Sequence, residues 1–158
     1  MIRPNSQHKR RPAGVVVEMA VISVVCLTFM FAIFEYGRVV MMQQIMENAS
    51  RAGARVAVVT ATSYVTPAVA TSNVNAVVNG QLASLKLSKV NITLFQADDT
   101  GNNIGPWTST SFGKNIVVQV DADCVNLFPT WGFLPNSSST TPNAVHLTAV
   151  TMMRGEAN

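Results

Sequence analysis

The one ionisable residue in the most apolar part of the chain is Glu18. It stands among the 20 residues from Val15 to Phe34, which contain no other charge. A charge in such a run is costly, since membrane-insertion scales assign roughly 2.5–3.5 kcal/mol to Asp, Lys or Arg at the bilayer centre. Two interpretations follow. Glu18 either reaches the headgroup region from the start of the run, or pairs with a partner's positive group after lateral assembly in the membrane.

Elsewhere the residue types and spacings do not form a catalytic or metal-binding motif. There is no glycine-rich phosphate loop, no histidine pair at metal-ligand spacing and no nucleophile elbow. His146 is expected on the solvated polar face of a strand. Asp121 and Asp123 share a strand face while Asp98 and Asp99 lie in a loop, and calcium needs six or more oxygen ligands that these pairs need not supply together. We therefore expect no enzymatic activity, no cofactor and no metal site.

The apolar run has the length of a membrane-spanning helix. At 1.5 Å per residue it extends roughly 30 Å, the thickness of the hydrocarbon core of a bilayer. A secretory signal peptide is the alternative, but its apolar core is usually about 7–15 residues and ends at a small-x-small cleavage site. Residues 35–38, EYGR, follow the run here. The sequence therefore favours a permanent membrane span.

The net charge of +3 does not indicate a nucleic-acid ligand. From residue 13 onward there are 7 Lys and Arg against 8 Asp and Glu, whereas a nucleic-acid footprint is expected on a folded face. The remaining basic residues precede the apolar run, where the positive-inside rule places the N-terminus in the cytoplasm and the C-terminal part outside. These residues are Arg3, Lys9, Arg10 and Arg11.

The sequence that leads into the apolar run is KRRPAGVVVEMA, residues 9–20. It resembles the class III signal of type IV pilins and pseudopilins, in which a prepilin peptidase removes a short basic leader. The resemblance implies a cut after Ala13, which makes Gly14 the new N-terminus and Glu18 the fifth residue. A cut after Gly14 is the alternative and would make Glu18 the fourth. The resemblance also implies that Glu18 sets register with the amino group of an adjacent subunit.

Beyond the membrane the helical pattern continues, which predicts one helix from Val15 to Thr62. Its apolar seam is expected to pack either in the core of its own domain or on another helix. The seam recurs at spacings of three and four residues through Met42, Ile45, Ala49, Ala52, Val56 and Val59.

Three segments of this helix together resemble the TadE-like pseudopilin family of tight-adherence pilus loci. They are residues 17–20 (VEMA), 35–38 (EYGR) and 47–55 (ENASRAGAR). The family has an aromatic residue where Met19 stands, and the resemblance covers about residues 10–60.

The rest of the chain predicts a second helix and a small antiparallel sheet. Ser72 is the expected N-cap of a helix that carries Val74, Val78, Leu82 and Leu85 on one side. Alternating apolar residues predict strands around residues 90–94, 116–124 and 145–149. The predicted fold class is α+β, with a leader at 1–13, a transmembrane helix at 14–36, its extension at 37–66 and an extracytoplasmic domain at 67–158.

An aromatic insert separates the last two predicted strands. Phe128, Trp131 and Phe133 lie between Pro129 and Pro135. These rings either cover an edge of the sheet or present a patch to a partner.

These features predict a minor pseudopilin-like structural component of a tight-adherence (type IVc) pilus or a related secretion system. It would be a single-pass protein of the bacterial inner membrane with a periplasmic domain. Its expected partners are the membrane, the prepilin peptidase, other pilins or pseudopilins and the pilus assembly platform. The alternative is an uncleaved, membrane-tethered binding module that captures an extracytoplasmic ligand.

Overall fold

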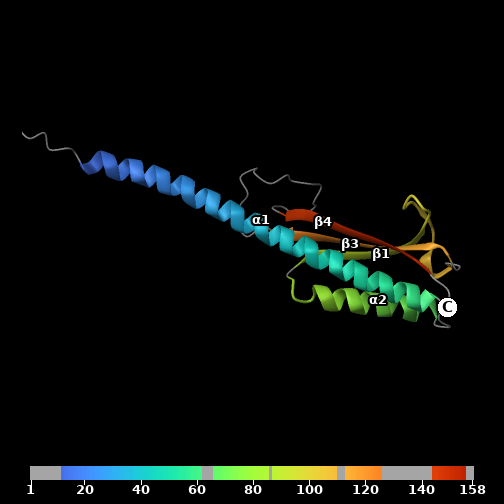
Figure 1. The fold of residues 1–158 in the computed structure, drawn as a ribbon. Coiled ribbons are helices and arrows are strands. Elements are labelled where there is room, and N and C mark those ends of the chain that lie inside the picture. The colour runs from blue at the N-terminus through green and yellow to red at the C-terminus, as the bar shows by residue number, and fades with distance from the viewer. Residues whose placement is uncertain (1–11, 62–65, 86, 110–112, 126–143, 156–158) are drawn as a thin grey trace, which may run out of the picture.

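A long helix and a small sheet domain make up the fold (Figure 1). The computed structural model describes residues 12–61, 66–85, 87–109, 113–125 and 144–155. The helices are α1 (Pro12–Ala61), α2 (Pro67–Leu82) and the short 3-10 helix η1 (Trp107–Ser109). The strands are β1 (Ser88–Ala97), β2 (Asn103–Gly105), β3 (Asn115–Val125) and β4 (Ala144–Arg154), and they form one antiparallel sheet in the order β2-β1-β3-β4. The predicted α+β class is confirmed.

Helix α1 is a single element of 50 residues with two different surroundings. Figure 1 shows its N-terminal part projecting away from α2 and the sheet. We call α2 and the sheet together the head. Every residue from Gly14 to Phe34 is exposed. From Glu35 onward one side of the helix is buried against the head. The long predicted helix is therefore confirmed.

The predicted seam of α1 was only partly right. Met42 and Ala49 are buried as expected, but Val59 is 65% exposed. Because α1 packs against both α2 and the sheet, the buried surface is wider than one seam and is turned from the predicted line. Its fully buried positions beyond Met42 are Met46, Ala49, Ser50, Gly53, Ala54 and Ala57.

Helix α2 packs closely on α1 at Gly53. A Cβ atom at Gly53 would lie 2.6 Å from Cγ2 of Val78, a separation that real Cβ atoms do not adopt. Val78 belongs to the buried side of α2 together with Ala70, Val74 and Leu82. The predicted N-cap at Ser72 was wrong, because α2 begins at Pro67 after Thr66. Proline is favoured in the first turn, where its missing N–H has no helical partner to lose.

The sheet covers the same side of α1 with its apolar face. All three predicted strands are present and longer than expected. On β3 the predicted apolar face is confirmed, since Ile116, Val118, Val120, Ala122 and Cys124 are all buried in the core. Val117 and Asp123 on the other face are also buried, so burial does not alternate strictly along the strand. Strand β2 was not predicted. It has only three residues inside a loop rich in Asn and Gly, and it exists through its pairing with Gln96 and Ala97 of β1.

Gly53→Ala is expected to destabilise the head. The added methyl group must displace Val78 or separate α1 from α2, and overpacking of this kind costs about 1–3 kcal/mol. Gly80→Ala is the matched control, because nothing lies within 4 Å of a Cβ there and alanine is the better helix former by about 1 kcal/mol. Thermal unfolding of the full chain in detergent should give a lower midpoint for Gly53→Ala and an unchanged or higher one for Gly80→Ala. Equal midpoints would contradict the close contact.

Candidate functional site on the long helix

Glu18 lies in the exposed part of α1, away from the head. It is the only charged residue from Gly14 to Phe34, and the apolar side chains around it are exposed by 41% (Phe31) to 72% (Ile33). The helix already begins at Pro12, so the bond between Ala13 and Gly14 belongs to its first turn. The leader before Pro12 lies outside the described residues.

The N-terminal part of α1 has the properties of a membrane span. Within the described chain, α1 is the helix that is long and apolar enough to cross a bilayer, and its most apolar window contains no buried residue. Exposed Val, Ile, Leu, Met and Phe on all sides of a helix would be unfavourable in water but are favourable in lipid. This helix fits a single-pass membrane protein.

An ion pair marks the point where the head first contacts α1. Arg38 Nη2 lies 2.6 Å from Glu35 Oε1, and the same nitrogen donates a hydrogen bond of 2.5 Å to the backbone carbonyl of Val125 at the end of β3. Glu35 is 5% exposed, so the carboxylate is largely removed from solvent. Tyr36 is exposed on another side of the helix. Residues 35–38 therefore connect α1 to β3, a role that a local sequence pattern does not reveal because the partner carbonyl is 87 residues away.

Cys124 lies beside this junction and is fully buried. Its Sγ atom is 3.0 Å from Sδ of Met42 on α1. Burial raises the pKa of the Cys124 thiol, so the thiol stays protonated and unreactive while α1 and β3 remain packed. Its reactivity therefore reports opening of the junction.

Glu35→Ala is expected to loosen the head from α1. It removes the carboxylate partner of the Arg38 guanidinium, and losing a charged hydrogen-bond partner costs about 1–3 kcal/mol when one partner is part-exposed. The measurement is the rate of Cys124 labelling across a denaturant series, in detergent and with Cys26 replaced by alanine. Glu47→Ala is the control, because the Glu47–Arg51 pair is exposed and an i, i+4 pair contributes about 0.3–0.5 kcal/mol. Equal labelling curves for the two variants would refute a structural role for the junction.

Polar contacts from α1 also hold β4, which is an edge strand of the sheet. Gln43 Nε2 donates a hydrogen bond of 3.1 Å to the backbone carbonyl of Thr148, and the hydroxyls of Ser50 and Thr151 lie 2.6 Å apart. Unpaired edge strands are prone to pair with other chains. Gln43 therefore satisfies one carbonyl of β4 within the subunit.

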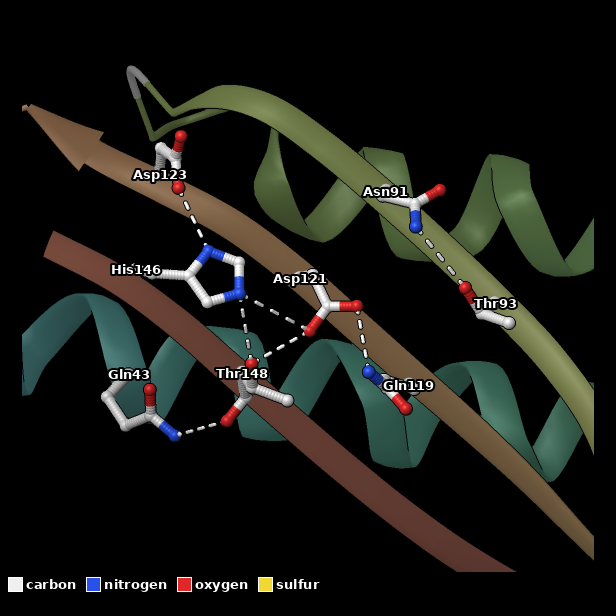
Figure 2. Close-up of polar contacts among 8 residues, drawn as sticks. All are labelled: Gln43, Asn91, Thr93, Gln119, Asp121, Asp123, His146 and Thr148. Atoms are coloured by element: carbon white, nitrogen blue, oxygen red, sulfur yellow. Dashed lines mark hydrogen bonds and ion pairs between the residues drawn. The ribbon is translucent and has the colours of Figure 1, made fainter. Parts of the chain in front are cut away.

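A polar network covers part of the sheet face opposite the helices (Figure 2). His146 Nδ1 lies 2.9 Å from Asp123 Oδ1, and its Nε2 lies 3.9 Å from Asp121 Oδ1. Asp121 accepts hydrogen bonds from Thr148 Oγ1 at 2.8 Å and Gln119 Nε2 at 2.9 Å. His146 is thus held by its neighbours and is not simply solvated. The open hollow at this face is lined by Lys89, Asn91, Gln119, Asp121, Asp123, His146 and Thr148.

The network contains an acid, an imidazole and a hydroxyl in the order of a hydrolase triad. His146 Nε2 is 3.4 Å from Thr148 Oγ1, while Asp123 holds the other ring nitrogen. The Thr148 hydroxyl, however, donates its proton to Asp121. A general base must accept that proton from the nucleophile, so this arrangement orders the strands and does not activate a nucleophile. Among the described residues no group of three or more His, Cys, Asp or Glu is placed to hold a metal ion.

The second acidic pair lies at another place on the sheet. Asp99 accepts a hydrogen bond of 3.0 Å from Asn115, which is six residues along β3 from Asp121. The Asp98 carboxylate caps the turn before β2 by accepting hydrogen bonds from the hydroxyl and the N–H of Thr100 and from the N–H of Asn102. These bonds, above all that from the Thr100 hydroxyl, lower the pKa of Asp98 to about 2.

The Asp98 turn is expected to resist moderate acid. A lowered folded-state pKa means that the stabilisation is complete above the ordinary value of 3.8 and is lost only as the pH falls through about 2. An NMR titration of the Asp98 carboxyl carbon should give a midpoint near 2, accompanied by a shift of the Asn102 amide. In Asp98→Asn that acid-dependent amide shift should vanish. A carboxyl midpoint near 3.8 would contradict the capping role.

The aromatic insert cannot be compared with its prediction. Phe128, Trp131 and Phe133 lie outside the described residues.

The structure brings together Glu35, Arg38 and the end of β3. It leaves Glu18 exposed, about 26 Å along the helix from Glu35 at 1.5 Å per residue.

A comparison with protein families adds a decisive observation about α1. The model of the family described as TadE-like protein matches residues 14–55. Residues 14–55 are therefore similar to this family. The match confirms the resemblance and points to involvement in a tight-adherence pilus. No curated protein and no solved structure shows significant similarity to the chain.

The matched segment coincides with α1 up to the last turns of the helix. Some of its residues face the core between α1 and the head, and others face away from it. Ala49, Gly53 and Ala54 face the core, whereas Arg51 and Arg55 are exposed. The inward residues are small and let α2 and the sheet approach the helix. Within the described residues, the outward Arg51 pairs with Glu47 of the same helix.

Proposed function

We propose that the protein is a minor pseudopilin-like component of a tight-adherence pilus or a related secretion system. It acts as a structural subunit in pilus assembly and not as an enzyme. Its α1 helix anchors it in the bacterial inner membrane, with the N-terminus in the cytoplasm and the head in the periplasm. Its partners are other pilins or pseudopilins and the pilus assembly platform.

The observation that carries this proposal is the exposed apolar half of α1 with Glu18 in it, inside a TadE-like segment. A simple membrane tether needs apolar residues but gains nothing from a carboxylate four residues into the run. A carboxylate that meets a neighbour's cationic group in lipid gives a directional contact, because neither member has water as a competing partner.

The cationic group proposed is a new amino terminus at Gly14. A prepilin peptidase would cut after Ala13, which removes the basic leader and leaves the amine four residues from Glu18. The first turn of α1, which begins at Pro12, would open for this cut.

Glu18→Ala is expected to leave membrane insertion and abundance unchanged but to reduce co-assembly strongly. Pull-down of tagged subunits from membranes and counting of surface pili measure the two properties separately. Glu18→Gln keeps the size and loses the charge, so it should fail like alanine, while Glu18→Asp should retain part of the assembly. If both neutral variants assembled normal pili, the proposed role of Glu18 would be refuted.

An uncleaved tether with a ligand-binding head is the second candidate. The observation in its favour is the open polar hollow on the outer face of the sheet, which includes Lys89 and Asp121. Intact-mass spectrometry of the membrane form discriminates the two functions. A mature chain that starts at Gly14 supports the pseudopilin, and a full-length chain in cells with active prepilin peptidase supports the tether.

A further inference from the structure

Strand β4 forms one side of the sheet, and part of its outer edge is open. Gln43 of α1 donates a hydrogen bond to the carbonyl of Thr148, so the peptide groups of Thr148 point away from β3 (Figure 2). This direction alternates along a strand, so the peptide groups of Val150 and Met152 also point away from β3. In the described structure these groups take part in no hydrogen bond on that side. We call residues 150–153 the open edge.

The other side of the sheet is protected against pairing with a further strand. The short β2 covers the end of β1, and the register of β1 shifts between Ser88 and Asn91. Lys89 lies in this irregularity with a positive φ of 52°. Short strands, bulges and lysines are devices by which proteins keep sheet edges from pairing with other chains. Residues 147–153, LTAVTMM, contain no charge, proline or glycine, so this part of β4 has none of these devices.

The side chains that point outward at the open edge are apolar. Val150 is 57% exposed and Met152 is 48% exposed. Met152 lies opposite Val117 of β3, which lies opposite Phe95 of β1. These three side chains form a row across the sheet face opposite the helices, and the row stops at the edge with Met152 half exposed. A further strand with an apolar side chain beside Met152 would continue the row and bury it.

Charged side chains of α1 border the same edge from the other face of the sheet. Gln43 Nε2 lies 3.5 Å from Glu47 Oε1, and Glu47 pairs with Arg51, so these residues follow one another along the side of α1 next to β4. The contact between Ser50 and Thr151 places Arg51 level with the open edge. Glu47 and Arg51 have side chains that are 45% and 62% exposed. A strand added to β4 therefore meets apolar side chains on one face and charges on the other.

The direction of β4 argues against a second copy as an antiparallel partner. Gln43 contacts Thr148 and Ser50 contacts Thr151. These contacts are about 10 Å apart along both elements, so β4 runs in the same direction as α1. Strand β1 shares this direction, because β1 and β4 are both antiparallel to β3. In copies anchored in one membrane through α1, these strands all point the same way. Strand β2 points the other way, but its three residues, NIG, carry no charge for α1.

We propose that the open edge binds an extended segment of a different extracytoplasmic polypeptide, which adds to β4 as an antiparallel strand. Sheets made only of antiparallel strands are favoured, and main-chain hydrogen bonds supply the affinity of such an added strand. One face of the segment has small or β-branched apolar residues beside Val150 and Met152. The other face has a carboxylate toward Arg51 and a cationic group toward Glu47. The proposal relies on the membrane anchorage proposed above only for the direction of the strands.

Hydrogen exchange of the full chain in detergent micelles tests the added strand. The probe is the capped peptide Thr-Glu-Val-Glu-Val-Lys-Thr, whose valines should lie beside Val150 and Met152. At about 1 mM, where weak complexes still form, it should slow exchange of the Val150 and Met152 amides at least about threefold. Exchange that the peptide leaves unchanged would overturn the proposal. Exchange that is slow without the peptide and becomes faster on dilution would show that a second copy covers the edge, and this would overturn it too.

Methylation of the peptide backbone supplies the matched control. In an antiparallel pair, residues directly opposite Val150 and Met152 exchange both hydrogen bonds with them. The valine amides of the peptide therefore face β4, whereas its glutamate amides face away. N-methylation of both valines should abolish the slowing, and N-methylation of both glutamates should leave it. Equal effects of the two methylated peptides would refute pairing through the backbone.

Variants of the chain locate the contact, with exchange at Met152 as the measurement. Val150→Pro removes an amide that faces the partner and spares the β3 ladder, so the effect of the peptide should be lost. Val150→Thr keeps the amide and should keep the effect. Slowing that survives Val150→Pro in a folded head would contradict the proposal, and the methylated peptides decide if this variant does not fold.

A charge exchange tests the face toward α1. Arg51→Glu should weaken peptide binding about two- to fivefold, the range expected for an exposed ion pair. A peptide with lysine in place of both glutamates should bind Arg51→Glu better than it binds the natural chain. If both peptides bind the two chains equally, the segment does not lie beside Arg51 and the assigned orientation is wrong.

The open edge and the pilus function fail separately in these experiments. If the peptide slows exchange while the Glu18 variants make normal pili, the added strand stands and the pilus function falls. If the Glu18 variants lose pili but the peptide leaves exchange unchanged, the pilus function stands and the added strand falls.

Discussion

The continuity of α1 is the constraint on which the rest of the structure depends. One helix of 50 residues is apolar and exposed over its first half and packs on a protein core over its second half. A break or kink between the two halves would uncouple the head from the exposed apolar segment. The change of environment is made within one turn, where Glu35 and Arg38 turn toward the head and Tyr36 remains exposed. The carbonyl at the end of β3 is thereby satisfied by Arg38 from the middle of α1.

Small side chains determine how the head is seated on that helix. Without a Cβ at position 53, Val78 of α2 reaches the α1 backbone, and Ala49, Ala54 and Ala57 are buried in the core that α1 shares with α2 and the sheet. Close packing of this kind gives many short-range contacts from residues that lose little side-chain entropy on folding. The polar contacts of Gln43 and Ser50 with β4 then fix the orientation of the sheet relative to α1.

The sequence allowed the elements to be predicted better than their contacts. Periodicity identified α1 and the buried face of β3, because long runs with a period of 3.6 or 2 leave little choice of structure. The line of the α1 seam and the start of α2 were missed, since they depend on which neighbours cover a surface and on a proline that fits the first turn. The Arg38–Val125 and His146–Asp123 contacts join residues far apart in the chain, which local patterns do not report. Glu18 was proposed as a site residue because a charge in an apolar run is a local anomaly, and its role stays a prediction.

The TadE-like match covers residues of α1 that face the head and residues of α1 that face outward. The match extends from residue 14 to residue 55, so it includes the small residues that seat α2 and also the exposed Arg51 and Arg55, but none of the head elements. Seating the head depends on the inward side of α1, where the buried residues between Met42 and Ala57 are two methionines, Ser50 and otherwise only glycine and alanine. That requirement leaves the identity of the outward residues undetermined. An outward glutamate and arginine one turn apart form an ion pair within α1 and support the helix itself, whereas the carboxylate of Glu18 has no such partner within its own apolar stretch of the helix.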